Sequence, residues 1–595
     1  MRDSAFTPHP SSNVRLGIDI GGTFTDFVLF DEQTGRYQTF KALSTPHDPA
    51  EAVLSALEAR GLNRPAVKIV HGSTVATNAL LERKGAVTAL VATAGFKDVL
   101  EIGRQNRPDI YDLFSRRPPA LVPPALRFEV QERVDHTGQP LIPLQSGDLP
   151  RLLADLRAAG VESVAVSLLF SFLYPHHEQQ IAGYLRQAGF FVSVSSEVLP
   201  EFREFERTST TVINAYVSPV MDRYLARLEQ ELATTDFRVM QSNGGSISAD
   251  QARREAVRCV LSGPAGGVVG AVYAARTAGY SRLLTFDMGG TSTDVSLCDG
   301  DIQTTTETEI DGLPVRVPMI DIHTVGSGGG SIGYVDAGGA LRVGPESAGA
   351  HPGPVCYGQG GQRPTVTDAN LVLGRLAADH FLGGQMPLDA PAAEQALHRL
   401  GREAGLSPQP GLTLAQTAAL GVIRVVNAHM ERALRVISVQ RGHDPREFTL
   451  VSFGGAGGLH AAALARSLGI PRVLIPPNAA TLSAFGMLAA DVVKDYVRTV
   501  MCSGDTPYRD LAGQIAGLEQ QALADLAAEG LPAEQIHLER LVDMRYRGQS
   551  YELTIPLRAG FAADFHDAHR QTYGYARPDA AVEVVNLRLR AVGQT

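Results

Sequence analysis

Two aspartates, each followed by a turn of glycine and threonine, are the residues whose type and spacing most directly suggest chemistry. Asp19 opens D-I-G-G-T-F-T-D and Asp287 opens D-M-G-G-T-S-T-D, so six of the eight positions are identical. A triphosphate needs backbone N–H groups at close range, hydroxyl donors and a carboxylate that holds Mg²⁺. Each motif offers all three in one turn, because glycine permits positive φ and removes side-chain bulk. We therefore predict that both turns bind nucleotide phosphates.

The prediction assigns Asp19 and Asp287 to catalysis and to Mg²⁺, directly or through water. The backbone and hydroxyl contacts to phosphate would come from Gly21, Gly22, Thr23 and Thr25 in the first turn, and from Gly289, Gly290, Thr291 and Thr293 in the second. Two such turns facing one another across a cleft would hold the β- and γ-phosphates from both sides. Either copy alone is equally typical of an ordinary Asp-Gly turn.

A third glycine cluster, F-G-G-A-G-G-L-H, follows the apolar segment F-T-L-V-S-F and opens a helical pattern. A bare backbone at a helix N-terminus suits a nucleotide, because the ligand can approach closely and the helix dipole favours negative charge. Close packing of the helix explains the same glycines equally well. The residues predicted to contact adenosine are Gly454, Gly455, Ala456, Gly457 and Gly458.

The residues that would handle protons are less clearly marked. Asp321 and His323 precede the glycine run G-S-G-G-G-S, where a histidine could act as acid or base near neutral pH. His71 is a similar candidate, and for each histidine a structural role as a hydrogen-bonded core residue stays open. Further candidates each have a simpler alternative: Asp368 and Asn370 as a helix N-cap, and Cys356 as a buried thiol with no adjacent base.

Three other polar groups favour structural interpretations. His566 and His569 have the i, i+3 spacing of metal ligands, but a solvated helix face is expected because no third ligand is near. The run from His176 to Glu178 is expected to form the first turn of a helix. Residues 201–210 are expected to be exposed helix surface, although Arg203 and Arg207 could reach an interface.

The elements that must position these residues follow an α/β pattern. Both aspartate motifs lie between apolar segments of a predicted β-hairpin, and strand and helix patterns alternate in between. The offset of 268 residues between Asp19 and Asp287 indicates an internal duplication. We predict that strands and helices alternate over 65–100 and 147–200, and that residues 312–370 are irregular. Long helices are predicted over 390–440. In the tail at 505–595, strands are predicted over 543–557 and 581–593.

Composition limits the class of protein. The chain has 595 residues, of which 44% are hydrophobic, so we expect three to five domains with substantial cores. The 63 acidic and 53 basic residues give a net charge of −10 without a basic block, which argues against nucleic acid as a partner. Four dispersed cysteines and the absence of a window of about 18 apolar residues predict a cytoplasmic protein that does not cross a membrane.

The order of the three glycine motifs resembles the actin/Hsp70/sugar-kinase ATPase superfamily. This resemblance implies an α/β fold of duplicated, ribonuclease H-like ATPase lobes with a C-terminal α+β domain. It also implies that Ser262–Gly267 and Ser483–Gly486 lie in small-residue helices that connect the lobes.

A more specific set of motifs looks like the A subunit of the hydantoinase/oxoprolinase family. The motifs are HGSTVATNALLERKGA, GFKDVLEIGRQNRPDIYDL, SGPAGG, DMGGTSTD, DIHTVGSGGGSI, PTVTDANLVLGRL, FGGAGGLHA and DMRYRGQSYEL. The family divides into an N-terminal domain, here 14–205, a central domain, 206–500, and a C-terminal domain, 501–595. Two departures are His351, where an acidic residue is expected, and an end at Thr595 that implies a trimmed C-terminal domain.

The family implies an ATP- and Mg²⁺-dependent hydrolase subunit that phosphorylates the carbonyl of a cyclic amide. A hydantoin, 5-oxoproline or a related lactam would be the substrate, and a B-type partner subunit would complete hydrolysis in a hetero-oligomer. One alternative is the nucleotide-binding subunit of a ketone carboxylase of the acetone or acetophenone type. A non-metabolic ATPase switch is the remaining alternative, because Hsp70 and actin share the hairpins.

Overall fold

The computed structural model describes residues 13–21, 24–45, 48–107, 110–112, 114–115, 117–234, 236–384 and 386–595. The chain divides into two compact units. The first unit contains Met1–Gly263, Thr304–Met319 and Ala490–Thr595, and the second contains Pro264–Gln303 and Ile320–Ala489. The division of the sequence into 14–205, 206–500 and 501–595 stays a prediction.

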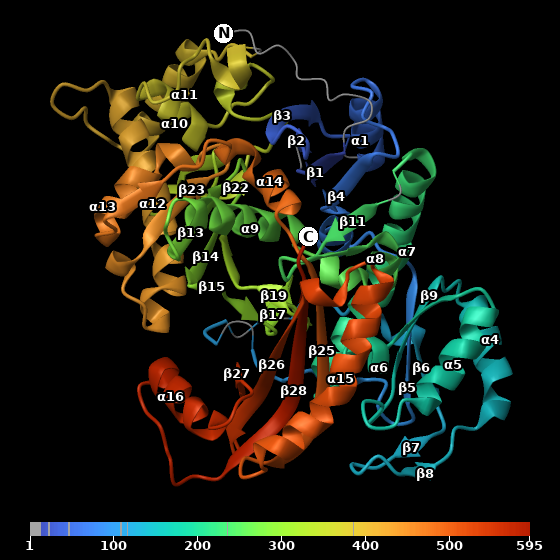
Figure 1. Ribbon diagram of the computed structural model, residues 1–595. Helices are drawn as coiled ribbons and strands as arrows, with labels where there is room; N and C mark the ends of the chain where they lie inside the picture. Colours follow the sequence, from blue (N-terminus) through green and yellow to red (C-terminus); the bar gives the residue numbers. More distant parts are fainter. Residues whose placement is uncertain are drawn as a thin grey trace. The chain divides into compact units, whose positions relative to one another are not determined.

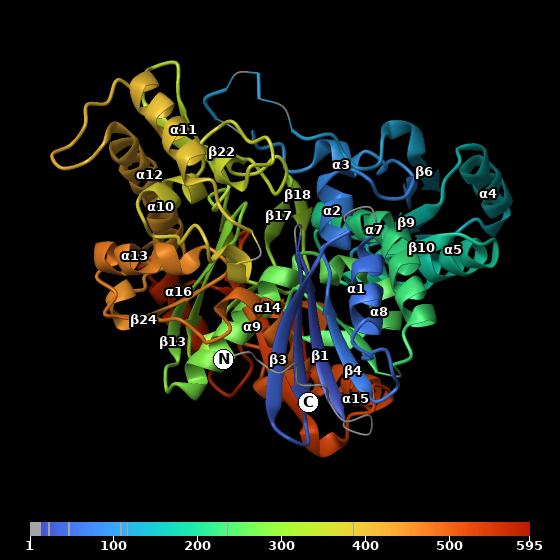
Figure 2. The same cartoon turned by 90° about the horizontal axis from the view of Figure 1, so that it is seen from above.

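The first unit is built on a ten-stranded mixed sheet. Its order is β27 (Leu553–Pro556), β26 (Ile536–Tyr546), β28 (Val582–Gly593), β25 (Val492–Ser503), β12 (Ser246–Ser248), β11 (Phe237–Met240), β4 (Val67–Gly72), β1 (Val14–Ile20), β2 (Phe24–Asp31) and β3 (Arg36–Leu43). β1 pairs antiparallel with β2 and parallel with β4, as the predicted hairpin requires. Figure 2 shows β1, β3 and β4 running side by side beneath α1 (Pro49–Glu58).

A second, all-parallel sheet of the first unit has the order β10 (Phe191–Val194), β9 (Ser163–Ser167), β5 (Thr88–Thr93) and β6 (Arg127–Val130). Its helices α4 (Leu149–Ala158) and α5 (His176–Gln187) confirm the predicted alternation of strand and helix (Figure 1). Nearly continuous apolar strands are typical of a sheet covered on both faces.

The long helix α7 (Glu204–Glu231) packs on both sheets of the first unit. Val212 and Ala215 contact the second sheet, whereas Ile213 and Leu225 belong to the core of the first. A helix covered on several sides has no polar stripe, so its sequence lacks the amphipathic pattern of a surface helix. The expectation of exposed helix surface over 201–210 is therefore wrong: Arg207 is 1% exposed.

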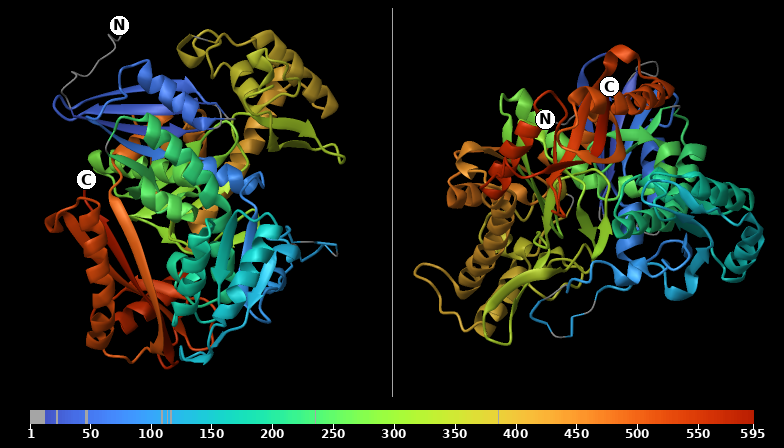
Figure 3. Two further views of the ribbon diagram at one scale, coloured as in Figure 1. Left: turned by 90° about the vertical axis from the view of Figure 1, so that its right-hand side faces the viewer. Right: turned by 90° about the horizontal axis from the view of Figure 1, so that it is seen from below.

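The C-terminal segment extends the large sheet rather than forming a separate one. β25, β26 and β28 are long antiparallel strands, and α15 (Tyr508–Ala528) lies along them (Figure 3). The predicted final strand is confirmed as β28. β26 begins at Ile536, seven residues before the predicted strand at 543, because its first half is mostly polar and pairs with β28 without being buried.

The second unit contains a six-stranded sheet around the second aspartate motif. Its order is β15 (Asp301–Ile302), β14 (Thr293–Asp299), β13 (Arg282–Met288), β23 (Thr449–Phe453) and β24 (Arg472–Leu474), and β20 (Ile322–Val325) also pairs with β14. The predicted long helices are α11 (Ala390–Glu403) and α12 (Leu414–Ile437). A capping box formed by Thr413 and Gln416 begins α12.

The two sheets repeat one strand order, which confirms the duplicated ATPase fold. In the first unit β3, β2, β1, β4 and β11 are neighbours, and in the second β20, β14, β13, β23 and β24 are neighbours. In both, the hairpin strands and the outer strand are antiparallel, and the two strands beyond the hairpin are parallel to its first strand. Parallel strands place their carboxyl ends, and the loops that follow, at one edge of a sheet.

Further elements are helices and the strands that lie outside the three sheets described above. They are α2 (Val75–Leu81), α3 (Val99–Ile102), α6 (Ser195–Val198), α8 (Ala249–Arg254), α10 (Val366–Val372), α13 (Ala461–Leu468), α16 (Phe561–Tyr573), β7 (Arg133–Val134), β8 (Pro140–Ile142), β16 (Thr304–Thr305), β17 (Thr308–Ile310), β18 (Leu313–Val315), β19 (Met319–Ile320), β21 (Ser331–Val335) and β22 (Leu341–Ser347). The short strands between 304 and 347 occupy much of the stretch predicted to be irregular. None of the helices within the described ranges is long and apolar enough to span a membrane.

Glycines bring two helices of the second unit into backbone contact. Ser262–Gly267 opens α9 (Ser262–Thr277) and Ser483–Gly486 lies in α14 (Leu482–Leu488), so the predicted helices are confirmed. A Cβ on Gly486 would lie 1.9 Å from the Gly266 carbonyl oxygen and 2.6 Å from the Gly270 nitrogen. Only glycine fits this crossing.

Gly486→Ala should therefore destabilise the protein, because the added methyl group overlaps backbone that cannot rotate away. We expect a loss of about 1–3 kcal/mol and a lower midpoint in scanning calorimetry. Gly513→Ala in α15 is the matched control, because a Cβ there meets no atom within 4 Å. This control should be neutral or stabilising by about 0.5–1 kcal/mol. Equal midpoints for the two variants would contradict the close packing.

Candidate active site

The two aspartate turns share one backbone geometry. Asp19 lies opposite Asp26 across the first hairpin, and Asp287 lies opposite Asp294 across the second. Each turn is closed by the same hydrogen bond: Gly21 N–H donates to the Phe24 carbonyl at 3.0 Å, and Gly289 N–H donates to the Ser292 carbonyl at 3.0 Å. The sequence repeat is thus a repeat of structure. Gly22 and Thr23 lie outside the described residues.

Asp19 stands at the carboxyl end of β1 in a mostly buried position. Burial, and then the Asp26 carboxylate, raise the pKa of Asp19 to about 7, although Lys41 acts in the opposite direction. Lys41 Nζ lies 2.7 Å from Asp26 Oδ1, so the Asp26 carboxylate is paired with a cation. A Cβ on Gly263 would lie 3.4 Å from Asp19 Oδ1, which places the start of α9 beside this carboxylate. A carboxylate with so raised a pKa is a good acceptor for a cation.

The glycine run after β20, Gly328–Gly330, is hydrogen-bonded to the backbone of the second turn. Gly329 N–H donates to the Gly289 carbonyl at 3.0 Å, and Gly330 N–H donates to the Gly290 carbonyl at 2.7 Å. In a trans peptide the C=O and N–H groups point in opposite directions. The N–H groups of Gly290 and Thr291 therefore point away from the glycine run, as an anion site requires. Gly290 and Thr291 are exposed.

The hydroxyls of Thr25 and Thr293 have partners inside the protein. Both residues are fully buried. The Thr25 hydroxyl lies 3.1 Å from the Ser44 hydroxyl, which itself donates to the Gly21 carbonyl at 2.8 Å, and the Thr293 hydroxyl donates to the Ser327 carbonyl. This arrangement differs from the direct phosphate contacts predicted for both hydroxyls. The two threonines brace the turns instead.

The third glycine loop packs against the second turn. Gly454 has φ +76°, and a Cβ there would overlap Asp287 Oδ1 at 2.2 Å. Ala456 N–H donates to the Met288 carbonyl at 2.9 Å. After the loop, Gly457 begins a 3₁₀ turn that leads into α13, as the predicted helix entry requires. Gly455 and Gly458 are exposed beside this junction.

Asp321 and His323 lie at β20, next to the second hairpin. Asp321 forms an ion pair with Arg441, and His323 lies opposite Val295 of β14 with its side chain half-buried. On the same strand, the Thr324 hydroxyl donates to Asp294 Oδ1. The structure thus brings β20 to the hairpin, but it gives Asp321 a cation partner of its own. A role of Asp321 and His323 in proton transfer stays a prediction.

The other histidine of this group has a buried structural environment. His71 Nε2 lies 2.6 Å from the Tyr224 hydroxyl, and burial lowers the pKa of His71 to about 4. His460, in the third loop, is also buried, and its Nδ1 lies 2.7 Å from Asn427 Oδ1. Burial lowers the pKa of His460 to about 4 as well. Both rings are neutral at physiological pH, which favours the core-histidine alternative for His71.

The candidates in 356–370 also have structural partners. The N-cap of α10 is Thr365 rather than Asp368 or Asn370. Asp368 completes the capping box from the third helical position and accepts from the Cys356 N–H at 2.8 Å, so its role is structural as the alternative expected. Burial raises the pKa of the Cys356 thiol, so this cysteine is not a thiolate. Asn370 Nδ2 lies 3.4 Å from His460 Nε2.

The expectation of a solvated helix face at His566 and His569 is wrong. His569 is 2% exposed, with Nδ1 2.8 Å from the Tyr575 carbonyl oxygen, and His566 Nδ1 lies 2.8 Å from the Tyr546 hydroxyl. The pair belongs to an aromatic cluster rather than to a solvated face. Across the described ranges, no group of three or more His, Cys, Asp or Glu side chains could hold a metal ion.

The run from His176 to Glu178 does begin α5, but it is more than a first turn. Glu178 is buried and accepts from the Ser195 hydroxyl at 2.7 Å, and His177 Nδ1 lies 2.8 Å from Glu132 Oε2. Arg203 likewise is not on a free surface, because its guanidinium lies 2.8 Å from Glu552. These partners are distant in sequence, which is why local patterns did not indicate them.

Comparisons with known proteins place the fold in a family. The model for the hydantoinase/oxoprolinase N-terminal region matches residues 15–189, and the hydantoinase/oxoprolinase model matches residues 207–496. The caprolactamase subunit alpha of Pseudomonas jessenii is 39% identical over 98% of this chain and 87% of its own length. The chain belongs to the hydantoinase/oxoprolinase family.

Solved structures and a longer relative agree with this membership. The crystal structure of the ATP-dependent caprolactamase from Pseudomonas jessenii has a TM-score of 0.88 at 38% identity, covering 98% of this chain and 88% of that one. A nucleotide-free structure of acetone carboxylase has a TM-score of 0.76 at 30% identity over the same shares. 5-Oxoprolinase 1 of Arabidopsis thaliana is 36% identical over 98% of this chain but only 50% of its own length.

The raised pKa of Asp19 predicts a pH-dependent cost to stability. With a pKa of about 7, its carboxyl keeps a proton in the folded chain up to about pH 7, whereas the unfolded chain releases it near the ordinary aspartate pKa of 3.8. Binding of this proton by the folded chain contributes to the free energy of unfolding. The contribution is fully present below about pH 4 and is lost as the pH rises toward 7. Asp19→Asn removes the dependence.

The midpoint difference, variant minus wild type, should therefore rise between about pH 4 and pH 7 and stay constant above, in Mg²⁺-free buffer. Asp299→Asn at the far end of the second hairpin, where the carboxylate is half-exposed beside Arg282, is the control and should show no such slope. A pH-independent difference for Asp19→Asn would contradict the raised pKa.

Proposed function

We propose that this chain is an ATP-dependent enzyme subunit that activates the carbonyl of a cyclic amide for hydrolysis. The observation that carries the proposal is the repeated carboxylate turn, with the same closing hydrogen bond and sheet neighbours in both units. Membership of the family supports the reaction class, because relatives include a caprolactamase and a 5-oxoprolinase. ATP use is supported by the ATP-dependent caprolactamase structure.

The turns would bind phosphate through backbone. Gly21, Gly22 and Thr23 are assigned to the first phosphate contact, and the N–H groups of Gly290 and Thr291 to the second. The exposed Gly455 and Gly458 of the third loop suit the approach of adenosine. Thr25 and Thr293 hold the turns in shape. Phosphoryl transfer needs mainly positioning and charge neutralisation, which backbone donors and carboxylates supply.

We assign Asp19 and Asp287, each at the carboxylate end of its own turn, to Mg²⁺. Mg²⁺ prefers oxygen ligands, commonly one or two carboxylates with water and phosphate oxygens. A cation would also offset the burial that raises the pKa of Asp19. When bound, Mg²⁺ would neutralise the charge that develops between the β- and γ-phosphates. His323 and Asp321 are the side chains that we assign to proton transfer.

Phosphorylation of the carbonyl oxygen would allow an otherwise unreactive ring to open. The carbonyl oxygen attacks the γ-phosphorus, the bond to the β–γ bridging oxygen breaks, and ADP leaves with that electron pair. After water adds to the ring carbon, the C–N bond breaks and the nitrogen leaves as an amine, having taken a proton. A second water hydrolyses the resulting acyl phosphate to carboxylate and inorganic phosphate. For a lactam, the product is an amino acid.

We further propose that a B-type partner subunit completes hydrolysis. The name of the Pseudomonas jessenii relative, subunit alpha, supports a multi-subunit enzyme. The chain also spans only half of the length of the Arabidopsis 5-oxoprolinase. Ketone carboxylation is the second candidate, favoured by the similarity to acetone carboxylase. Family membership gives the ATPase switch no support.

Asp19→Asn and Asp287→Asn should each lower ATP turnover by orders of magnitude while circular dichroism stays unchanged, because each removes a charge assigned to Mg²⁺. ADP release would be measured with lactams, hydantoins and ketones, with and without the partner. Asp299→Asn in the second hairpin is the control and should retain turnover. Near-normal turnover in either aspartate variant removes that residue from the metal role, and stimulation by ketone with bicarbonate alone favours the carboxylase.

Gly328→Ala should weaken ATP binding at least tenfold. A Cβ on Gly328 would lie 2.6 Å from the Gly290 carbonyl carbon and 2.7 Å from the Thr291 nitrogen, so it must displace the second turn. Calorimetry with ATP and Mg²⁺ measures the loss. Gly183→Ala, at an exposed position of α5 with no atom within 4 Å of the new Cβ, should bind ATP normally. Unchanged affinity in Gly328→Ala would exclude the second turn from the nucleotide site.

A further inference from the structure

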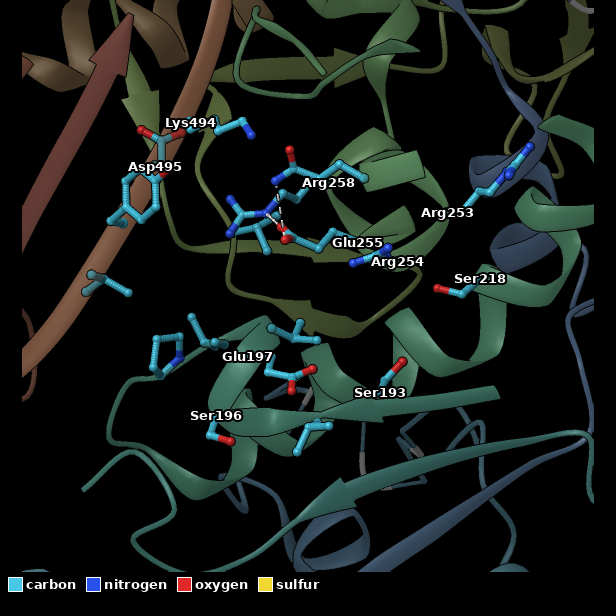
Figure 4. A pocket seen from close by; sticks show the side chains of 18 of the residues that line it. Ser193, Ser196, Glu197, Ser218, Arg253, Arg254, Glu255, Arg258, Lys494 and Asp495 are labelled. Carbon is cyan, nitrogen blue, oxygen red and sulfur yellow. Dashed lines mark hydrogen bonds and ion pairs between the residues drawn. The ribbon is translucent and has the colours of Figure 1, made fainter. Parts of the chain in front are cut away.

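A cavity of about 940 Å³ lies within the first unit, away from the residues assigned above. Its walls come from β10 and α6, from α8 and the 3₁₀ turn Ala256–Cys259, and from β25 with α15. Figure 4 shows Lys494 and Asp495 of β25 on one side, Glu255 and Arg258 in the middle, and Ser196 and Glu197 of α6 below. The volume suits a small-molecule ligand.

The lining carries charges of both signs in equal number, seven basic and seven acidic residues. Several pair with a neighbour on the same wall: Arg186 lies 3.0 Å from Glu197, and the mostly exposed Arg254 lies 2.9 Å from Asp250. Such rim pairs contribute little binding energy. The informative charges are those deeper inside the cavity.

Arg258 and Asp495 are partly buried residues of opposite charge in the lining. The Arg258 side chain is 16% exposed, and its Nε is paired with Glu255. Burial acts to lower the pKa of Arg258, but the Glu255 and Asp495 carboxylates outweigh burial and raise it, so Asp495 lies within electrostatic range. Asp495 Oδ2 accepts from Asn243 Nδ2 at 2.7 Å, an amide rather than a cation. Within the described part of the chain, the Arg258 Nη atoms donate no hydrogen bond, so a carboxylate could accept from them.

Unpartnered hydroxyls and apolar side chains complete the lining. Ser218 is 5% exposed, and its Oγ, like Ser196 Oγ, is buried without a hydrogen-bond partner among the described residues. In Figure 4 the Ser218 hydroxyl points toward the cavity. Leu199, Val497 and Leu518 provide apolar surface between the charged walls. A buried polar atom without a partner is costly unless a ligand satisfies it.

We propose that this cavity binds a zwitterionic amino acid, the ring-opened product of the cyclic amide. The inference rests on the proposed function for the identity of that product. Ring opening converts one neutral amide into an ammonium group and a carboxylate joined by a short carbon chain. Arg258 binds the carboxylate, Asp495 binds the ammonium group, and the apolar side chains contact the carbon chain. A neutral lactam offers no carboxylate to Arg258 and no cation to Asp495, whose partner is an amide, which disfavours it in this cavity.

The cavity is connected to the first aspartate turn by a short segment. Gly263, which adjoins Asp19, is the fifth residue after Arg258, so the Cα atoms of Arg258 and Gly263 are at most about 18 Å apart. The Arg258 carbonyl accepts from the Ser242 N–H at 2.7 Å, which fixes this segment at the end of β11. Product held at Arg258 therefore sits within reach of the loop beside Asp19, and we expect it to inhibit turnover.

Calorimetry on the wild-type chain without nucleotide tests the proposal. The probes are ω-amino acids of four to eight carbons and glutamate, each compared with its lactam, and for six carbons also with hexanoate and hexylamine. At least one zwitterion should bind, tenfold or more tighter than its lactam and than either singly charged analogue. Binding of no zwitterion, or equal binding of a lactam, overturns the proposal.

Variants locate the binding site. Arg258→Gln and Asp495→Asn should each weaken the zwitterion at least tenfold, because each removes one charge-assisted contact. Arg151→Gln, whose side chain is 88% exposed on α4, should bind normally. Asp495→Asn keeps the shape of the side chain and serves if Arg258→Gln does not fold. Unchanged affinity in Asp495→Asn places the ligand elsewhere and overturns the assignment.

The same measurements separate this inference from the proposed function. Asp287→Asn should lose ATP turnover but keep full affinity for the zwitterion, because the cavity and Asp287 belong to different units. Normal turnover with cyclic amides but no zwitterion binding would overturn only the cavity proposal. Zwitterion binding in a chain that never turns over cyclic amides would overturn the proposed function and leave an amino-acid site.

Discussion

The second carboxylate turn depends on backbone-to-backbone contact that only glycine permits. Gly329 and Gly330 hold the carbonyls of Gly289 and Gly290, which turns the next two N–H groups the opposite way. A side chain on Gly328 would overlap this turn, and one on Gly454 would overlap Asp287. The site therefore derives its donor geometry from main chain, which needs no rotamer to be ordered and is preorganised before a ligand binds.

The two copies reach the same geometry with different supports. In the first unit, Ser44 bonds the Gly21 carbonyl and Lys41 pairs with Asp26. In the second, the glycine run takes the place of Ser44, and the Thr324 hydroxyl takes the place of Lys41. The turn itself is repeated with its closing hydrogen bond, whereas many side chains can serve as braces. These supports are functional neighbours that the repeated motif did not reveal.

Buried ion pairs join the distant segments of the first unit. Glu201 is 1% exposed and lies 2.8 Å from both Arg316 and Arg588. Arg316 belongs to the segment Thr304–Met319 of the first unit, and Arg588 belongs to β28. Breaking one member of such a group leaves an uncompensated buried charge, so the group fixes the register between segments. The cavity proposed to bind an amino acid is lined by the same three residues. Its charged wall is thus held by the packing of the unit.

The sequence by itself determined the hairpins, the three glycine loops, the duplication and the family. These features are local, because a turn or helix start is specified by residues a few positions apart. Only the tertiary structure decided that Arg207 and His569 are buried, that Thr25 and Thr293 face inward, and that Arg258 and Asp495 share a cavity. Burial and charge pairing depend on segments hundreds of residues apart, such as Arg203 and Glu552, and no local pattern encodes such partners.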